Sequence, residues 1–248
     1  SNTGVSKGAG YTKFFTVPIY VRLHMLSLAA SFAPAFHQAA RVTRAALYGT
    51  STDAQLPKHL QSDARVPFLG FCGPCYAKGG VVLLAINPGG GGDAYTSRPP
   101  QDSELIPLLE AFVAAAPEVV QSSFIRMCAS YSAQVQTWNL WRILHPTMQA
   151  CRITLEQACY LNLFPYRTAK DACPLSGALK NAWNEVASPL LQTLQPSLLV
   201  ALGKKAGNVA ERLHSAPPPL YVVPRTIGDT YVSAEALRIL AAIRERAA

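Results

Sequence analysis

The stretch Val81-Val82-Leu83-Leu84-Ala85-Ile86-Asn87-Pro88-Gly89 decides the fold. Its first part, residues 81–86, is a continuous apolar run, which is typical of a strand buried on both faces of a parallel sheet. The run ends at Asn87-Pro88 and then at four glycines, Gly89–Gly92, which indicate a loop. Parallel α/β sheets bind their ligands beyond the carboxyl ends of the strands. We therefore expect Asn87 and the glycine run to border a binding site.

Strands and helices are predicted to alternate along the rest of the chain. Further strands are expected over 159–164, 197–202 and 220–223, and helices over 103–116, 124–144, 176–194, 204–213 and 233–246. This alternation predicts an α/β fold, a three-layer α/β/α sandwich with a mostly parallel central sheet. The alanine-rich periodicity of 31–47 predicts an N-terminal helical elaboration, residues 1–66, on an α/β core of residues 67–248, with both parts in one globular unit.

The composition narrows the class of protein. The chain has 248 residues and a formal net charge of +8, and half of its residues are hydrophobic, which excludes a disordered chain. Its apolar runs are too short for a membrane span, and its polar N-terminus lacks the apolar run of a secretion signal. We therefore expect a cytoplasmic, monomeric protein with reduced thiols and no membrane contact. The positive charge favours a nucleic-acid partner, and solubility alone is the alternative.

The glycine run has several possible roles. A nucleotide-binding P-loop would need a Lys-Ser or Lys-Thr pair after its glycines, whereas Gly89–Gly92 is followed by Asp93-Ala94-Tyr95. A flexible surface turn is one remaining interpretation. The other is a loop wall without Cβ atoms, which lets the backbone approach a ligand closely or leaves room for a bulky one. In that case Asn87 is placed to hold a water or a substrate carbonyl.

Four segments together resemble the uracil-DNA glycosylase superfamily. Ala85-Ile86-Asn87-Pro88-Gly89 is similar to the first active-site motif of its mismatch-specific and single-strand-selective branches. Residues 138–144, 161–165 and 196–203 resemble later segments of that family in the same order, so the resemblance covers about residues 68–246. The loop 223–231 departs from the family because it lacks the histidine of the second motif. His145-Pro146-Thr147 imitates that motif but lies in the wrong half of the chain.

The resemblance implies an enzyme, a monofunctional DNA glycosylase that hydrolyses the N-glycosidic bond of a flipped pyrimidine and leaves an abasic site. It implies that Asn87 positions the attacking water and that Asn162 reads the Watson–Crick edge of the base. Tyr95 would line the pocket or stack on the base. Each residue also has a structural alternative. Asn87 could bond to its own turn, Asn162 could be a satisfied buried amide, and Tyr95 could be an ordinary core or rim residue.

Other residues complete the expected site. Asp93 is a candidate general base, Asp229 is a candidate acid or hydrogen-bond partner of the leaving base, and capping a turn is the alternative for both. Arg225 could supply positive charge where the family has its histidine. Further base contacts are expected from Gly89, Gly90 and Phe164.

Four cations near the predicted loops are expected to contact DNA phosphates, and ordinary solvated surface charge is the alternative for each. They are Arg167, Lys170, Lys204 and Lys205.

The glycine wall and the missing histidine bear on the substrate. Bulk near C5 of the base would exclude large pyrimidines, whereas four glycines leave space. We therefore expect a bulky C5-modified cytosine, such as glucosylated hydroxymethylcytosine in phage DNA, and a role in anti-phage defence, or else uracil. A non-catalytic DNA-binding relative of the same fold is the main alternative. A small-molecule nucleoside hydrolase is a third interpretation, but it would not need the basic charge.

Six cysteines raise the question of a metal or redox site. Cys72-Gly73-Pro74-Cys75 spells the thioredoxin motif, but a strand rather than a long helix follows it, which disfavours redox catalysis. In the resembling superfamily, some members bind an iron–sulfur cluster through a Cys-x-x-Cys and two later cysteines. The corresponding ligands here would be Cys72, Cys75, Cys173 and an off-pattern Cys159, since Tyr166 occupies the third position. Free thiols without a cofactor are the main expectation, with a cluster or zinc as the weaker alternative.

Overall fold

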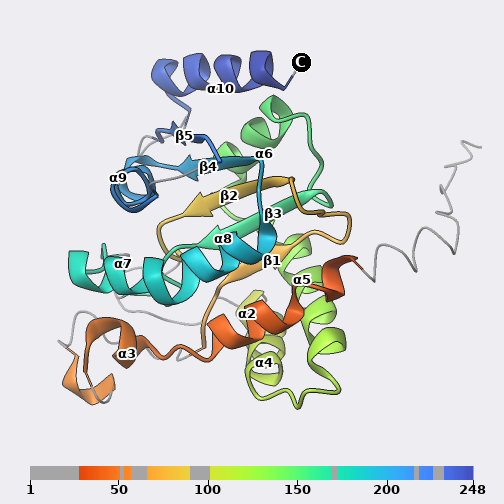
Figure 1. The fold of residues 1–248 in the computed structure, drawn as a ribbon. Coiled ribbons are helices and arrows are strands. Elements are labelled where there is room, and N and C mark those ends of the chain that lie inside the picture. Colours follow the sequence, from red (N-terminus) through yellow and green to blue (C-terminus); the bar gives the residue numbers. More distant parts are fainter. Residues whose placement is uncertain are drawn as a thin grey trace, which may run out of the picture.

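Five strands form a single mixed sheet in the computed structural model, which describes residues 28–50, 53–56, 66–89, 101–168, 172–214, 218–225 and 232–247. Their order across the sheet is β1-β3-β2-β4-β5 (Figure 1). Four of them are parallel, and β1 runs antiparallel to β3 at one edge. The strands are β1 (Gly70–Cys72), β2 (Val81–Ala85), β3 (Ala158–Asn162), β4 (Leu198–Leu202) and β5 (Leu220–Val223).

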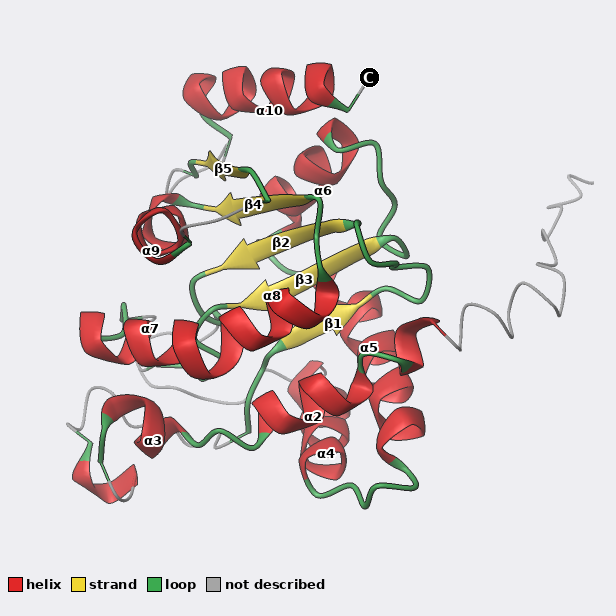
Figure 2. Cartoon of the chain, viewed as in Figure 1, coloured by secondary structure: helices red, strands yellow, loops and turns green. Residues whose placement is uncertain are grey.

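Helices cover both faces of this sheet (Figure 2). The connection from β2 to β3 holds three of them, and the connection from β3 to β4 crosses back in the opposite direction. Right-handed crossovers therefore put the two groups on opposite faces. The helices are α2 (Ala33–Ala40), α3 (Arg44–Tyr48), η1 (Asp53–Gln55), α4 (Gln101–Val113), α5 (Val120–Val135), α6 (Trp141–Ala150), α7 (Ser176–Ala182), the π-helical turn η4 (Trp183–Ala187), α8 (Ser188–Leu194), α9 (Lys204–Leu213) and α10 (Ala234–Arg246).

The two-sided burial explains the continuous apolar runs. Every residue of β2, β3 and β4 is buried, so neither face of these strands needs polar side chains. The mixed α/β architecture and the mostly parallel sheet predicted from the sequence are thereby confirmed. The helices predicted over 204–213 and 233–246 are also present, within one residue of the expected bounds.

One local prediction is wrong, and one strand was not predicted. The helix expected over 124–144 is two helices, because residues 136–140 form turns between α5 and α6. There the backbone N–H of Thr137 bonds back to Gln134, and so does its hydroxyl, so α5 ends in a tight turn. Trp138 then packs edge-on against Tyr131, with ring centroids 5.2 Å apart. Strand β1 was not predicted, since three residues are too few to show a period.

The first described segment belongs to the same core. Phe32 and Phe36 are buried, and Phe36 packs against Phe124 of α5 with ring centroids 4.8 Å apart. On the other side of α2, Phe32 contacts Tyr76 edge-on, at 5.6 Å between centroids. The N-terminal helices are thus packed on the α/β core. Among the described residues, none of the helices combines the length and apolarity that crossing a membrane requires.

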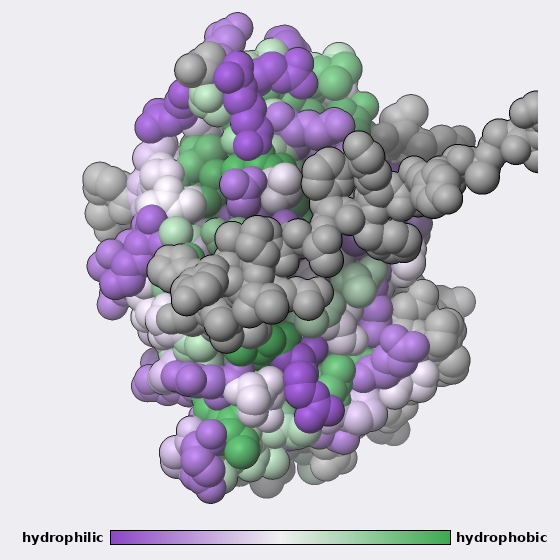
Figure 3. Space-filling model, turned by 90° about the vertical axis from the view of Figure 1, so that its right-hand side faces the viewer, coloured by the Kyte–Doolittle hydropathy of each residue, from purple (hydrophilic) through white to green (hydrophobic). Residues whose placement is uncertain are grey.

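The amino ends and the carboxyl ends of the parallel strands lie on opposite sides of the molecule. The parallel strands point to the left in Figure 1, so the face shown in Figure 3 lies at their amino ends. On that side, a groove of about 600 Å³ runs between α5 and the turn after β1 and includes Cys72 and Cys128 in its lining. The carboxyl ends lie on the opposite side, which we call the carboxyl edge of the sheet. Asn87 lies there, just after the carboxyl end of β2.

Candidate active site at the carboxyl edge of the sheet

Asn87 lies at the switch point of the sheet. It follows β2, from which the chain goes on to β3 on one side, whereas from the adjacent β4 the chain goes on to β5 on the other side, so the switch point lies between the carboxyl ends of β2 and β4. In open α/β sheets, the crevice at such a point is where ligands bind. The predicted motif residues Asn87, Asn162 and Gly203 stand at the ends of the adjacent strands β2, β3 and β4. The structure therefore brings three of the four resembling segments to one edge, whereas residues 138–144 belong to the start of α6.

The Asn87 side chain is held by the segment after β3. Its Nδ2 donates a hydrogen bond of 3.2 Å to Oγ1 of Thr168, and Thr168 in turn donates to the carbonyl oxygen of Ala172 at 2.5 Å. Thr168 is fully buried, whereas Asn87 is half-buried and therefore partly accessible. Beyond it, Gly89 is exposed, and a Cβ at that position would meet open space within the described structure. Asn87 thus has a fixed amide beside accessible space.

Arg167 is not a surface residue, so the prediction that it contacts a DNA phosphate is wrong. Its guanidinium makes two hydrogen bonds of 2.7 Å to the two carboxylate oxygens of Asp102 in the first turn of α4. The side chains of both residues are at least nine-tenths buried. The guanidinium also lies over the ring of Phe68, 4.2 Å from its centroid. This ion pair fastens the start of α4 to the segment after β3.

The amide of Asn162 is bonded inside the protein. Its Oδ1 accepts from the hydroxyl of Tyr160 at 2.8 Å, and its Nδ2 donates to the Phe68 carbonyl at 2.7 Å and to the Tyr131 hydroxyl at 3.2 Å. Burial raises the pKa of Tyr131 and of Tyr160, so both phenols stay protonated. Asn162 itself is only 2% exposed. This arrangement matches the structural alternative, and reading a base would require these bonds to open.

Replacing Asn162 with alanine separates its two roles. The substitution leaves the Phe68 carbonyl and two phenols without their partner, so we expect the free energy of unfolding to fall by about 1–3 kcal/mol. Urea denaturation measures this change. The matched control is Asn139→Ala on the exposed turn before α6, for which we expect a change within about 0.5 kcal/mol. Unchanged stability of Asn162→Ala together with lost base release would instead support base reading.

Phe164 is also part of the core. It is fully buried and packs edge-on against Tyr48, with ring centroids 5.4 Å apart, and against Tyr166 at 6.1 Å. No face of this ring is open to a base, which corrects the prediction that Phe164 binds one. The hydroxyl of Tyr166 donates to the Val42 carbonyl at 2.6 Å, so this segment also anchors the N-terminal helices.

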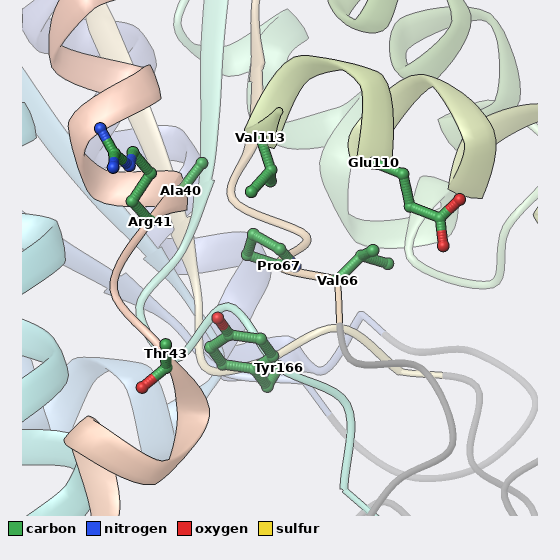
Figure 4. Close-up of a pocket in the computed structure, with 8 residues that line it drawn as sticks. All are labelled: Ala40, Arg41, Thr43, Val66, Pro67, Glu110, Val113 and Tyr166. Atoms are coloured by element: carbon green, nitrogen blue, oxygen red, sulfur yellow. The ribbon is translucent and has the colours of Figure 1, made fainter. Parts of the chain in front are cut away.

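Tyr166 also lines a pocket of about 350 Å³ beside the carboxyl edge (Figure 4). The pocket lies between the end of α2 and α4. Its charged members, Arg41 and Glu110, are well separated, and both side chains extend away from the centre of the pocket in Figure 4. The centre is therefore formed by apolar groups and by the Tyr166 ring. The full lining is Ala40, Arg41, Thr43, Val66, Pro67, Glu110, Val113 and Tyr166.

Cations surround the ends of β4 and β5. Arg225 is exposed, and its aliphatic stem lies across Gly203, where an added Cβ would be 3.4 Å from Cγ of the arginine. Burial raises the pKa of Tyr160 on β3, and the positive charge of Arg225 opposes this effect. Lys204 and Lys205 are exposed at the start of α9, and Nζ of Lys204 lies 3.2 Å from Oε2 of Glu235. Arg225 is therefore an exposed cation at the carboxyl end of β5, which is two strands away from β2 in the sheet.

Several predicted residues cannot be placed. Asp93, Tyr95, Gly90, Lys170 and Asp229 lie outside the described residues. Their roles stay predictions. The described residues that flank them, such as Gly89, Thr168 and Arg225, all belong to the carboxyl edge.

The structure does not bring the four candidate cysteine ligands together. Cys72 pairs with Cys159 across β1 and β3, near the amino end of β3, and its N–H contacts Sγ of Cys128 at 3.4 Å. Cys173 follows the carboxyl end of β3, and at about 3.3 Å per residue the length of that strand alone is roughly 13 Å. Burial raises the pKa of Cys128 and of Cys159, so both remain thiols. Within the described ranges, no cluster of His, Cys, Asp or Glu is arranged to hold a metal ion.

The prediction from sequence missed Thr168. It is separated from Asn87 by 81 positions, and no motif connects the two residues. The only available signal was its place shortly after a predicted strand end. Comparison with known proteins adds nothing to the site, because neither the family models nor the curated proteins that were searched match this chain.

Proposed function

We propose that the chain is a DNA glycosylase that hydrolyses the N-glycosidic bond of an extruded pyrimidine nucleotide. The observation that carries the proposal is the position of Asn87, a fixed and partly accessible amide at the switch point of the sheet. Two features support it. The net charge of +8 suits a phosphate backbone, and Arg225 provides an exposed cation at the same edge.

The reaction needs few groups from the protein. The bond between C1′ of the sugar and the base nitrogen breaks, and its electron pair leaves with the base. A water oxygen bonds to C1′, and the proton that it loses balances the charge on the departing base. Asn87 would orient the water through its Oδ1, and Arg225 would stabilise the negative base. Asp93 as the general base and Asp229 as the acid complete the proposal as predicted roles.

The substrate is proposed to be a C5-modified cytosine, with uracil as the second candidate. The described part of the glycine run supports space for a substituent, because a Cβ on Gly89 would meet no atom within 4 Å. Glucosylated hydroxymethylcytosine in phage DNA is such a base, and releasing it would serve anti-phage defence. A panel of DNA substrates with each candidate base, scored for abasic sites, tests the choice. Release from uracil-containing DNA alone would contradict the bulky-base proposal.

Asn87→Ala is the direct test of catalysis. We expect base release to fall by roughly 100-fold or more, because the water loses its orienting acceptor. DNA binding, measured by fluorescence anisotropy, should be retained. Asn184→Ala, at an exposed asparagine of η4 outside the resembling segments, provides the matched control and should release base at the wild-type rate. Equal rates in Asn87→Ala and the wild type would exclude Asn87 from the reaction.

A non-catalytic DNA-binding protein is the second candidate. The observation that favours it is the engagement of Asn162 and Phe164 inside the core, which leaves two expected base contacts unavailable. Such a protein would bind DNA with an affinity that falls steeply as salt rises. It would release no base from any member of the panel. The substrate panel therefore distinguishes the two candidates.

A further inference from the structure

The hydrogen-bond chain behind Asn87 fixes which end of its amide faces Thr168. The carbonyl oxygen of Ala172 can only accept, so the hydroxyl proton of Thr168 must be donated to it. The lone pairs of Thr168 Oγ1 then face Asn87, and only an N–H can bond to them. The chain is therefore directional, from Asn87 through Thr168 to Ala172. It determines that Nδ2 points to Thr168 and that Oδ1 points elsewhere.

Burial makes this orientation strict. Thr168 has no accessible surface, so water does not compete for its hydroxyl. A rotated Asn87 would place Oδ1 against Oγ1, leaving two acceptors in contact without a proton between them. Among the residues that the structure describes, no hydrogen bond to Oδ1 of Asn87 is found. This oxygen is therefore the available acceptor on a half-buried side chain at the carboxyl edge.

The residue that precedes Thr168 is itself held in place. The preceding residue, Arg167, makes two 2.7 Å bonds to Asp102 and packs on Phe68. The two consecutive residues thus bond to Asn87 and to Asp102, which lie on either side of residues 88–101. The hydroxyl that orients Asn87 consequently belongs to a residue whose immediate neighbour is anchored in the core.

We propose that Thr168 is a positioning residue that holds the Asn87 amide with Oδ1 toward the substrate, as the acceptor for a proton of the attacking water. This inference rests on the proposed function for the identity of the water. A rotated amide would present N–H groups, which cannot accept a proton from water. Thr168 therefore contributes to the rate without touching the substrate.

The first test observes the amide itself. The side-chain N–H signals of Asn87 are followed by ¹⁵N–¹H NMR in the full chain and assigned by their loss in Asn87→Asp. Thr168→Val keeps the shape but removes the hydroxyl, so we expect the signals to shift and to exchange faster with solvent. Thr168→Ser keeps the hydroxyl and should restore the wild-type signals. Unchanged Asn87 signals in Thr168→Val would overturn the proposal.

Thr147→Val is the matched control. Thr147 is also fully buried, and its hydroxyl donates to the Ile143 carbonyl at 2.7 Å within α6, far from Asn87 in the chain. Its loss should leave the Asn87 signals in place. If Thr168→Val does not fold, Thr168→Ala removes the same hydroxyl and is measured instead. A shift of the Asn87 signals in Thr147→Val as large as that in Thr168→Val would attribute the effect to general loosening and overturn the proposal.

The second test measures base release on the substrate that the wild type accepts. We expect Thr168→Val to lower kcat by about 10-fold to 100-fold with little change in KM, and Thr168→Ser to recover most of that loss. Wild-type kcat in Thr168→Val would overturn the catalytic role. If the wild type releases no base from any DNA, the proposed function fails, whereas the NMR result still decides whether Thr168 orients Asn87.

Discussion

Replacing Arg167 with methionine is expected to lower the free energy of unfolding by about 3–5 kcal/mol. The substitution removes both 2.7 Å hydrogen bonds to Asp102 and leaves that carboxylate buried without its cation. It also removes the cation–π contact with Phe68. Urea denaturation monitored by circular dichroism measures the loss, and the slope of the transition should stay constant.

Two further variants test the reason for this loss. Lys204→Met breaks the ion pair with Glu235, whose members are both more than half exposed, and should cost no more than about 1 kcal/mol. Combining Arg167→Met with Asp102→Leu removes both buried charges and should recover most of the stability. If Arg167→Met proves as mild as Lys204→Met, the Asp102 pair contributes far less to the fold than its burial implies.

Gly70→Ala is expected to destabilise the protein by at least about 3 kcal/mol, which places it among the severe substitutions. Gly70 begins β1 with φ of 120°, a conformation that residues with a side chain rarely adopt. In addition, an added Cβ would overlap the carbonyl oxygen of Tyr160 on the paired strand β3. The pairing that carries Phe71 and Cys72 would have to shift.

Gly177→Ala is the control for this effect. Gly177 lies in the first turn of α7, has an ordinary φ, and has no atom within 4 Å of an added Cβ. Alanine there should stabilise the protein by about 0.5–1 kcal/mol, because it restricts the unfolded chain. Thermal and urea unfolding of both variants give the comparison. A Gly70→Ala protein as stable as the wild type would mean that β1 tolerates a different register.

The predictable parts of the fold are those that are determined by residues close together in the sequence. The apolar runs of β2 and β4 and the helix that begins after Gly203 are each specified within about ten residues. Strand β1 could not be found in this way. Its three residues acquire a role only from pairing with β3, about ninety positions later in the chain.

In the candidate site, too, only the features with a local cause were predictable from the sequence. The position of Asn87 follows from the end of an apolar strand, so the sequence was sufficient. The buried role of Asn162 was only one of two alternatives and that of Arg167 was not predicted, because both roles depend on partners from remote segments. Tyr131 and Phe68 turn the Asn162 amide inward, and Asp102 draws Arg167 away from the surface. Long-range pairing of polar groups leaves no periodic pattern in a sequence.

The adjacent residues Arg167 and Thr168 affect how the length of one connection in this protein can vary. Asn87 is hydrogen-bonded to Thr168, and Asp102 is hydrogen-bonded to Arg167. The two ends of the connection between Asn87 and Asp102 are therefore held by the segment after β3. The entropic cost of closing a longer connection grows only slowly with its length. We therefore expect a longer or shorter connection between Asn87 and Asp102 to change the stability of the sheet only slightly. The framework of the fold is thus fixed at Asn87 and at Asp102 independently of the length of the connection between them.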